Sequence, residues 1–242
     1  MSYNLYMKNT FFNKIIQKEL IKYKIRQLKI KTPYEITDDL VVNFNGSVNL
    51  ADKGLTKIPF KIGIIQGDFN CGNNKLKSLI NGPSIVMGSY YCNHNNLISL
   101  EGVAHTIYDN FDCAWCFIES LENSPGYVGK NYSCNANKIK SLKGIQKVIC
   151  GNFICTNNLL KSLKNGPEIV REVYYCNDNP IITWIYLPKE VQSFRCNIKE
   201  KKTIFNFEDV KKLQKEEMIL KNYDALNNSL ITRGSSKKSL KI

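Results

Sequence analysis

The sequence of 242 residues is poor in the groups that most enzymes use. It contains only two histidines, His94 and His105. Neither a G-x-x-x-x-G-K-[ST] phosphate-binding loop nor a G-x-G-x-x-G turn occurs, and no Ser-His-Asp arrangement follows from the spacing. Glu119 and Glu122 are three residues apart, on a segment expected to be exposed, which is typical of a solvated edge. We therefore expect no enzyme activity, no catalytic residues and no cofactor.

Long apolar runs are also absent. No segment reaches the run of about 18 uncharged apolar residues that a membrane-spanning helix needs. Lysines interrupt every apolar run near the N-terminus and no small-residue cleavage site follows, so we predict no secretory signal. Without export, the nine cysteines are expected to stay reduced thiols. These absences predict that the protein is located in the cytoplasm of a host cell or in a virion.

Acidic residues are too few to balance the basic ones. The chain has 34 Lys and Arg against 21 Asp and Glu, a net charge of +13. Such an excess suits a nucleic acid, an anionic membrane surface or an acidic protein, and charge alone does not choose among them. Per residue, the two ends are more basic than the middle.

What the sequence does contain is a repeat marked by cysteines. Six cysteines follow one another at intervals of 21 residues, and a seventh comes 20 residues later: Cys71, Cys92, Cys113, Cys134, Cys155, Cys176 and Cys196. Two residues before each stands an aromatic: Phe69, Tyr90, Phe111, Tyr132, Phe153, Tyr174 and Phe194. Three residues after come asparagines, with Cys116 in their place once: Asn74, Asn95, Asn137, Asn158 and Asn179. Aliphatic side chains recur five and eight residues after the first six of these cysteines, apart from Trp184, which stands eight residues after Cys176.

This pattern predicts a repeat solenoid of the leucine-rich-repeat type, with one short parallel strand and an irregular return in each 21-residue repeat. Alternation around Phe69 and Cys71 predicts a strand with both side chains inward. The asparagine is expected to hydrogen-bond neighbouring backbone where the chain leaves the strand. Because one copy cannot bury its own apolar face, the copies must stack around a shared core.

The text "GDFNCGNNKLKSLINGP" at residues 67–83 resembles a family of leucine-rich-repeat proteins common in tailed bacteriophages and some mobile elements, with repeats of the form GDFxCxxNxLxSLxxxP. The resemblance covers roughly residues 40–198. It implies a curved parallel solenoid and a phage-encoded protein, but little about activity, because most members have none assigned. The copies "FDCAWCFIESL" and "FRCNIKE" depart from the pattern.

We predict three regions. Residues 1–36 form a basic amphipathic helix closed by Pro33, with Phe12, Ile15, Ile16 and Leu20 available to pack on a neighbour. Residues 41–198 form the solenoid, with a divergent capping repeat at 41–66 and six to seven repeats after it. Residues 199–242 form a second amphipathic helix and a disordered basic tail, 233–242. The candidate packing residues of this helix are Phe207, Val210, Leu213, Met218 and Leu220. Either helix could cap the solenoid or dock on another protein.

The pair Cys113 and Cys116 has the spacing of a redox or zinc half-site. However, Cys113 keeps the cysteine register, Cys116 falls in the asparagine register, and no second half-site follows. We therefore interpret both as core side chains, expect no metal site, and expect no disulfides along the ladder.

Residues that flank each cysteine should point out of the core, on the strand side of the solenoid. That surface is polar, nearly free of lysine and carries three large aromatics, the type of residue that anchors protein interfaces. The candidate binding residues on this concave face are Asp68, Asn70, Tyr91, Asn93, His94, Asp112, Trp115, Tyr175, Asn177 and Arg195. Alternatively, this face has no binding function, the asparagines are only surface residues of the repeat, and the aromatics only cover small gaps.

Lysines recur at another place in the repeat, between the asparagine and the return. They predict a basic edge that could contact nucleic acid, although a charged edge is more often only solvated. Its residues are Lys75, Lys77, Lys138, Lys140, Lys143 and Lys161. The sequence thus favours a non-catalytic protein-binding module for an unidentified host or phage partner, with a nucleic-acid-associated protein or a structural virion component as alternatives.

Overall fold

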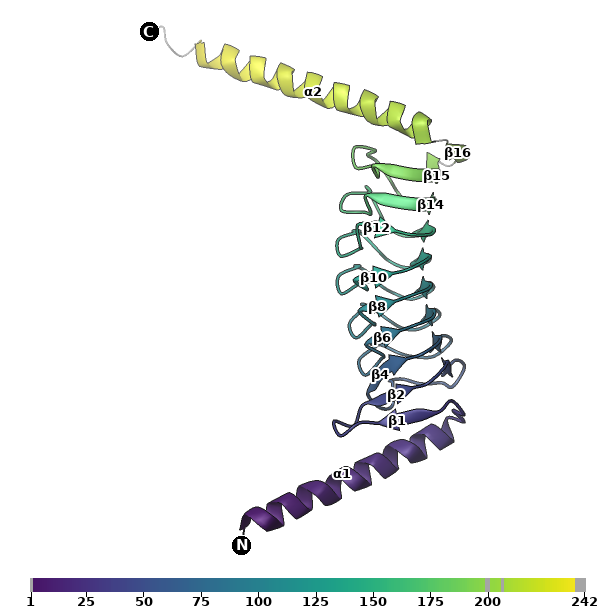
Figure 1. Cartoon of the computed structure of the whole chain (residues 1–242). Helices are drawn as coiled ribbons and strands as arrows, with labels where there is room; N and C mark the ends of the chain where they lie inside the picture. Colours follow the sequence, from purple (N-terminus) through teal and green to yellow (C-terminus); the bar gives the residue numbers. More distant parts are fainter. Residues whose placement is uncertain (1, 199–200, 206, 238–242) are drawn as a thin grey trace.

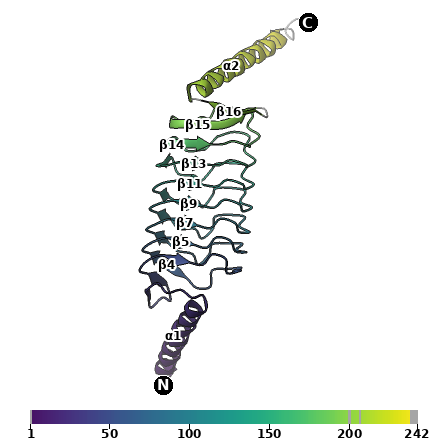
Figure 2. The same ribbon diagram turned by 90° about the vertical axis from the view of Figure 1, so that its right-hand side faces the viewer.

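The structure is a computed structural model that describes residues 2–198, 201–205 and 207–237. A parallel β-solenoid of about seven turns stands between two helices, α1 (Ser2–Gln27) and α2 (Phe207–Lys237). Figures 1 and 2 show the turns stacked nearly in line. The repeat solenoid predicted from the cysteine spacing is confirmed, but the stack lacks the curvature that the family resemblance implied.

The strands that carry the cysteine register form one sheet, here called the cysteine sheet. Neighbouring strands pair in parallel with a shift of 21 residues, so that Phe69 faces Tyr90 and Tyr90 faces Phe111. Its parallel strands are β3 (Val48–Asn49), β5 (Phe69–Asn70), β7 (Tyr90–Tyr91), β9 (Phe111–Asp112), β11 (Tyr132–Ser133), β13 (Phe153–Ile154), β14 (Ile169–Tyr175) and β15 (Glu190–Ile198).

A second sheet lies in the return segments, here called the return sheet, and the sequence did not predict it. Pairs such as Ile85–Val86 and Thr106–Ile107 lie in parallel register. The sheet consists of β1 (Tyr34–Ile36), β2 (Val42–Phe44), β4 (Ile62–Ile65), β6 (Ile85–Val86), β8 (Thr106–Ile107) and β10 (Tyr127–Val128). The next return strand, β12 (Val148–Ile149), pairs with β14, which also pairs with β13, so β12 belongs to the cysteine sheet and the return sheet ends at β10.

The core lies between the sheets. Seven aromatic rings form a continuous ladder, with centroids of successive rings 5.0–5.9 Å apart. The cysteines of the register and the aliphatic residues that follow are buried beside it. All nine cysteines are free thiols, and Cys150 is the one that is half-buried.

The predicted asparagine ladder joins the turns. The side-chain nitrogen of Asn158 donates to the carbonyl oxygens of Cys134, Cys155 and Thr156, and its Oδ1 accepts the N–H of Ile139. One side chain thus satisfies four backbone groups that β pairing leaves free at the bend. The other asparagines of the register repeat this arrangement.

A second polar ladder runs along the corner where the chain passes from the return sheet to the cysteine sheet. In each turn a side-chain oxygen accepts the backbone N–H of the residue 21 positions later, as Asn110 does from Asn131. Its members that accept in this way are Ser47, Asp68, Ser89, Asn110, Asn131 and Asn152.

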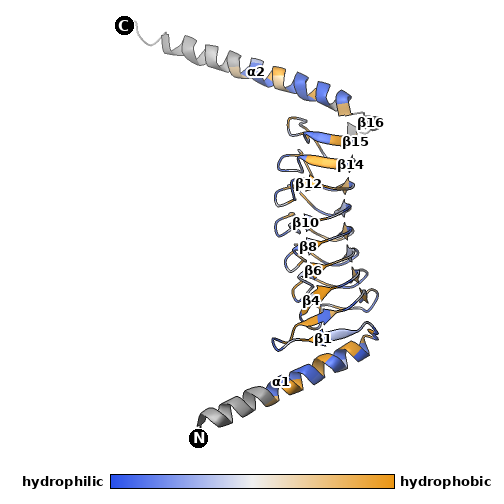
Figure 3. Ribbon diagram, viewed as in Figure 1, coloured by the Kyte–Doolittle hydropathy of each residue, from blue (hydrophilic) through white to orange (hydrophobic). Residues whose placement is uncertain are grey.

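The N-terminal end differs from the prediction. Helix α1 ends at Gln27 rather than near Pro33, and β1 follows and pairs antiparallel with β2. Among the α1 residues whose side chains the structure describes, Ile21 and Ile25 are buried against the first turn. The predicted packing residues Phe12, Ile15, Ile16 and Leu20 are instead exposed, because the preceding part of the helix extends away from the solenoid (Figure 3).

At the other end, β16 (Lys201–Phe205) pairs antiparallel with β15 and covers its edge. Phe207 packs against the core and Leu213 is half-buried, whereas Met218 and Leu220 are exposed, so the predicted packing set is half right. Val210 lies outside the residues whose side chains the structure describes. The tail predicted to be disordered is helical through Lys237, and residues 238–242 lie outside the described part.

Candidate binding face

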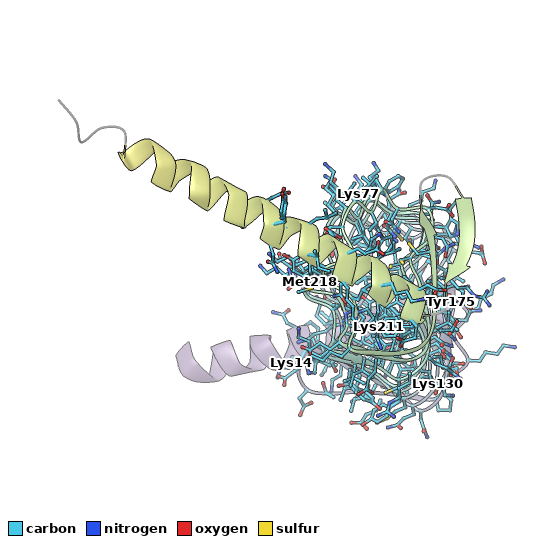
Figure 4. All side chains as sticks on the ribbon, turned by 90° about the horizontal axis from the view of Figure 1, so that it is seen from above. Lys14, Lys77, Lys130, Tyr175, Lys211 and Met218 are labelled. Carbon is cyan, nitrogen blue, oxygen red and sulfur yellow. The ribbon has the colours of Figure 1, made fainter. Side chains whose placement is uncertain are left out.

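The outer side of the cysteine sheet carries most of the predicted binding residues. Tyr91 and Asp112 are direct neighbours in the β7–β9 register. Asn93, His94 and Trp115 follow them on the same two turns. Figure 4 shows that both helices extend away from the side on which Tyr175 lies, so they leave this face open. The sequence did place these residues on one surface, and the turns that carry it stack nearly in line (Figures 1 and 2).

His94 and Trp115 form an aromatic platform on this face. Their rings are parallel, with 5° between the planes and 5.6 Å between the centroids. Trp115 remains 56% exposed. One side of the indole is therefore supported by the imidazole, and much of the ring is still available to a ligand.

The backbone under the platform is costly for such residues. His94 has a φ of 52° and Trp115 a φ of 55°, both in the left-handed region. The same conformation recurs at this place in the other turns, where the residues are Asn73, Ala136, Asn157 and Asp178. Asparagine, aspartate and histidine tolerate that region better than an indole does. A bulky aromatic there costs about 1 kcal/mol or more relative to a tolerant residue. The left-handed backbone is therefore a property of the repeat, and Trp115 is the residue at which it is costly.

Asp112 places a partly buried carboxyl group beside the platform. Burial raises the pKa of this group, although the Ala114 N–H, which donates to Oδ1 at 2.9 Å, and the nearby His94 lower it. The Ser133 hydroxyl can also donate to the carboxylate, or to Oδ1 of Asn135 at 2.7 Å. Among the described residues, no lysine or arginine forms an ion pair with Asp112.

The remaining predicted residues divide into two groups. Tyr175, Asn177 and Arg195 lie near the C-terminal end, three turns from Trp115, with the Arg195 guanidinium carbon 5.3 Å from the centroid of the Tyr175 ring. Tyr175, Asn177 and Arg195 therefore form a second cluster, which is distinct from the His94–Trp115 platform.

Asp68 and Asn70 are occupied in the framework of the fold. The Asp68 carboxylate accepts the Ser89 N–H at 2.7 Å and belongs to the corner ladder, and Asn70 accepts the Gly72 N–H at 2.9 Å. Their polarity is therefore explained by backbone satisfaction alone.

The predicted lysine edge is exposed but partly neutralised. Lys140 pairs with Glu119 at 3.0 Å and Lys143 with Glu122 at 2.7 Å, across successive turns. Lys138 lies over the Phe117 ring at 5.0 Å. The two ion pairs leave Lys75, Lys77, Lys138 and Lys161 to carry the charge of the edge.

Sequence reasoning missed an exposed face on the return sheet. Tyr108 and Tyr127 form an edge-to-face pair there, with ring centroids 6.0 Å apart, and are 50% and 46% exposed. Met87 and Val148 extend this apolar surface. The signal was present, because the outward position of each return strand repeats every 21 residues as Ile85, Thr106, Tyr127 and Val148.

Cys113 and Cys116 lie in the core, as predicted. Burial raises the pKa of Cys116 to about 11, and that of Cys113 well above its ordinary value. A thiol that stays protonated is a poor nucleophile. Within the described part of the chain, no three His, Cys, Asp or Glu side chains gather in a way that could hold a metal ion.

Comparison with protein-family models, curated proteins and solved structures gave no match. The resemblance to phage repeat proteins therefore stays a prediction. Among the helices of the described residues, none has both the length and the apolar character of a membrane span.

Proposed function

We propose that the chain is a non-catalytic protein-binding module that recognises its partner through the outer face of the cysteine sheet. The observation that carries this proposal is the His94–Trp115 platform, an exposed indole held in left-handed backbone on a rigid stack of turns. Exposed Trp and Tyr side chains supply most of the binding energy in many protein interfaces. A rigid surface also loses little conformational entropy on binding.

The surroundings of the platform favour a protein over a polyanion. From Asn49 to Asp178, the residues directly before and after each register position include no lysine and no arginine, although Arg171 is exposed elsewhere in β14 and the chain as a whole carries +13. The carboxyl groups of Asp68 and Asp112 lie on or beside this surface. Phosphate groups would therefore be repelled here. The proposed setting, from the repeat resemblance alone, is a phage-infected host cell or a virion.

One observation favours the alternative of a nucleic-acid-associated protein. On the lysine edge, Phe117 is 45% exposed beside Lys138, which gives a base a ring to stack on next to a positive charge. The pairing of Lys140 and Lys143 with glutamates weakens that edge as a phosphate site. We therefore rank it second.

An affinity capture experiment from bacterial lysate separates the two functions. Tagged wild-type protein is compared with the triple variant Tyr91→Ala, Trp115→Ala, Tyr175→Ala, with and without nuclease, at low and high salt. The matched control is Tyr108→Ala, Tyr127→Ala, which removes two exposed aromatics from the return sheet.

We expect one protein to be retained through nuclease and high salt, lost from the triple variant and kept by the control. Recovery of nucleic acid that salt removes, with no effect of the triple variant, would overturn the proposal and support the lysine edge, because phosphate contacts weaken steeply with salt.

A further inference from the structure

Two tyrosines on the cysteine sheet occupy equivalent places but have opposite neighbours. Tyr91 in β7 and Tyr175 in β14 each stand one residue before a cysteine of the register. In the next turn, Tyr175 faces Arg195 and Tyr91 faces Asp112. The chain thus repeats one tyrosine position with a cation above it at one end and a carboxyl group above it at the other.

The C-terminal pair shows what such a tyrosine can hold. The Arg195 guanidinium lies over the Tyr175 ring, with its carbon 5.3 Å from the ring centroid. This is the range in which a guanidinium is attracted by the face of an aromatic ring. The spacing between adjacent turns therefore suits a tyrosine–guanidinium contact.

The pair of Tyr91 and Asp112 has the aromatic ring and a carboxyl group, but no arginine or lysine between them. Asp112 is half-buried, and its carboxyl group accepts the Ala114 N–H and can also accept the Ser133 hydroxyl, both of which are neutral donors. Within residues 2–198, 201–205 and 207–237, none of the ion pairs involves this carboxyl group. A partly desolvated carboxylate gains most from a cation that arrives with hydrogen-bond donors.

Trp115 supplies a second aromatic surface next to this carboxyl group. It lies three residues beyond Asp112 on the same turn, and Ala114, with its small side chain, is buried between them. His94 stacks against the indole with a 5° angle between the planes and so fixes its orientation. Tyr91 and Asp112 thus precede Ala114, and Trp115 follows it, on the outer face of two adjacent turns.

We propose that Tyr91, Asp112 and Trp115 form a recognition site for an arginine side chain of the partner protein. The inference rests on the proposed function and names the chemistry that the partner presents. A guanidinium group can stack on an aromatic ring while donating two hydrogen bonds to one carboxylate. A lysine ammonium lacks the planar fork, so arginine is the preferred ligand.

The test uses N-acetyl-arginine methylamide, with the citrulline analogue as its uncharged control of nearly equal shape. Binding to the full chain is followed by NMR through the indole N–H of Trp115 and the amide of Ala114. The variants are Asp112→Asn, which keeps an acceptor for the Ala114 N–H, and Asp39→Asn, which changes an exposed acidic residue outside the binding face in the same way.

We expect the arginine probe to shift both signals saturably, and the citrulline probe to bind at least fivefold more weakly. Asp112→Asn should weaken the arginine probe at least fivefold, and Asp39→Asn should change its affinity by less than twofold. Equal responses to the two probes, or no saturable shift of the Trp115 indole, would overturn the inference.

The capture experiment then separates this inference from the proposed function. If the triple aromatic variant loses the partner while the arginine probe shows no preference over citrulline, the binding face is correct and the arginine site is wrong. If the probe binds as expected but the captured partner is indifferent to the triple variant, the proposed function fails instead.

Discussion

The hydroxyl groups of Tyr132 and Ser124 lie 2.6 Å apart inside the solenoid. Tyr90 and Tyr174 occupy the equivalent places two turns before and after, but Gly82 and Gly166 stand where Ser124 does. Among the described residues, the hydroxyls of Tyr90 and Tyr174 have no hydrogen-bond partner. They interact only with the weakly polar sulfurs of Cys71 and Cys155. The three tyrosines of one ladder therefore differ in hydrogen bonding because the residue beside the hydroxyl is serine in one turn and glycine in the other two.

This difference predicts opposite effects of removing a hydroxyl group. Tyr132→Phe should lower the free energy of unfolding by about 1 kcal/mol, because a buried hydrogen bond is lost and the Ser124 hydroxyl is left without it. Tyr90→Phe should leave the stability unchanged or raise it by up to about 1 kcal/mol, because an unsatisfied buried hydroxyl is removed. Urea denaturation of both variants measures the difference, and equal losses in the two would contradict it.

The thiol of Cys116 gives a second prediction. In the neighbouring turns, asparagine accepts an N–H at this place, as Asn137 does from Ile118 at 3.0 Å. Here the N–H of Leu97 meets the sulfur of Cys116, a weaker acceptor. Cys116→Asn should therefore raise the free energy of unfolding by about 1 kcal/mol. The converse change, Asn137→Cys, is the matched control and should destabilise the protein, and a stabilising Asn137→Cys would show that the ladder bonds do not decide stability.

The sequence predicted the parts of the fold in which every turn repeats the same residue. Cys155 and Asn158 recur with fixed spacing because each turn presents the same environment, so the period alone placed them in the core and at the bend. The corner ladder was not predicted, because its members each supply a side-chain acceptor oxygen but differ in residue type. Ser89, Asn110 and Asp68 have the same role. The return sheet was not predicted, because strands of two residues are too short to show an alternation of apolar and polar residues.

The candidate site was predictable as a surface but not as a set of contacts. Register placed Tyr91, Asp112 and Trp115 on the outer face. It could not show that His94 lies flat on Trp115, because that contact depends on left-handed backbone at both residues. Nor could helical periodicity show that Phe12 is exposed, since the direction in which α1 leaves the first turn is not a local property.

Buried thiols make the stability dependent on alkaline pH. Burial raises the pKa of Cys116 from 9.0 to about 11, and the pKa values of Cys92, Cys113 and Cys155 well above 9.0. In the unfolded chain these thiols ionise near pH 9, while in the folded chain they stay protonated. Their contribution is complete below pH 9 and is lost as pH rises above it, by about 1.4 kcal/mol per pH unit for each thiol.

Urea denaturation between pH 7 and pH 10.5 measures this effect. We expect a nearly constant free energy of unfolding up to about pH 8 and a steep fall above about pH 9. Cys116→Asn removes one of the thiols and should make the fall shallower. A free energy that stays constant through pH 10 would mean that the thiols are accessible to solvent in the folded protein.

The contact between Glu217 and the last turn decides whether α2 is a cap. Its carboxylate accepts the N–H of Trp184 at 2.7 Å and the hydroxyl of Thr183, and Gln214 donates to the Ile185 carbonyl at 2.7 Å. Burial opposes ionisation, but these donors and Lys221 outweigh it and lower the pKa of Glu217. The contact is therefore strongest above the ordinary carboxyl pKa of 4.5 and is lost as pH falls through the lower value in the folded chain.

Glu217→Ala should accordingly speed hydrogen exchange at the Trp184 amide by about tenfold or more at neutral pH, since one charge-assisted hydrogen bond is worth about 1.5–3 kcal/mol. Glu216→Ala, which changes the neighbouring exposed carboxylate, is the control and should leave that exchange unaltered. Faster exchange confined to residues 183–185 would mean that α2 shields the last turn locally, whereas faster exchange reaching β14 would make it a cap on which the final turns of the solenoid depend. Unchanged exchange in Glu217→Ala would instead mean that α2 does not stabilise the solenoid and only projects from its end.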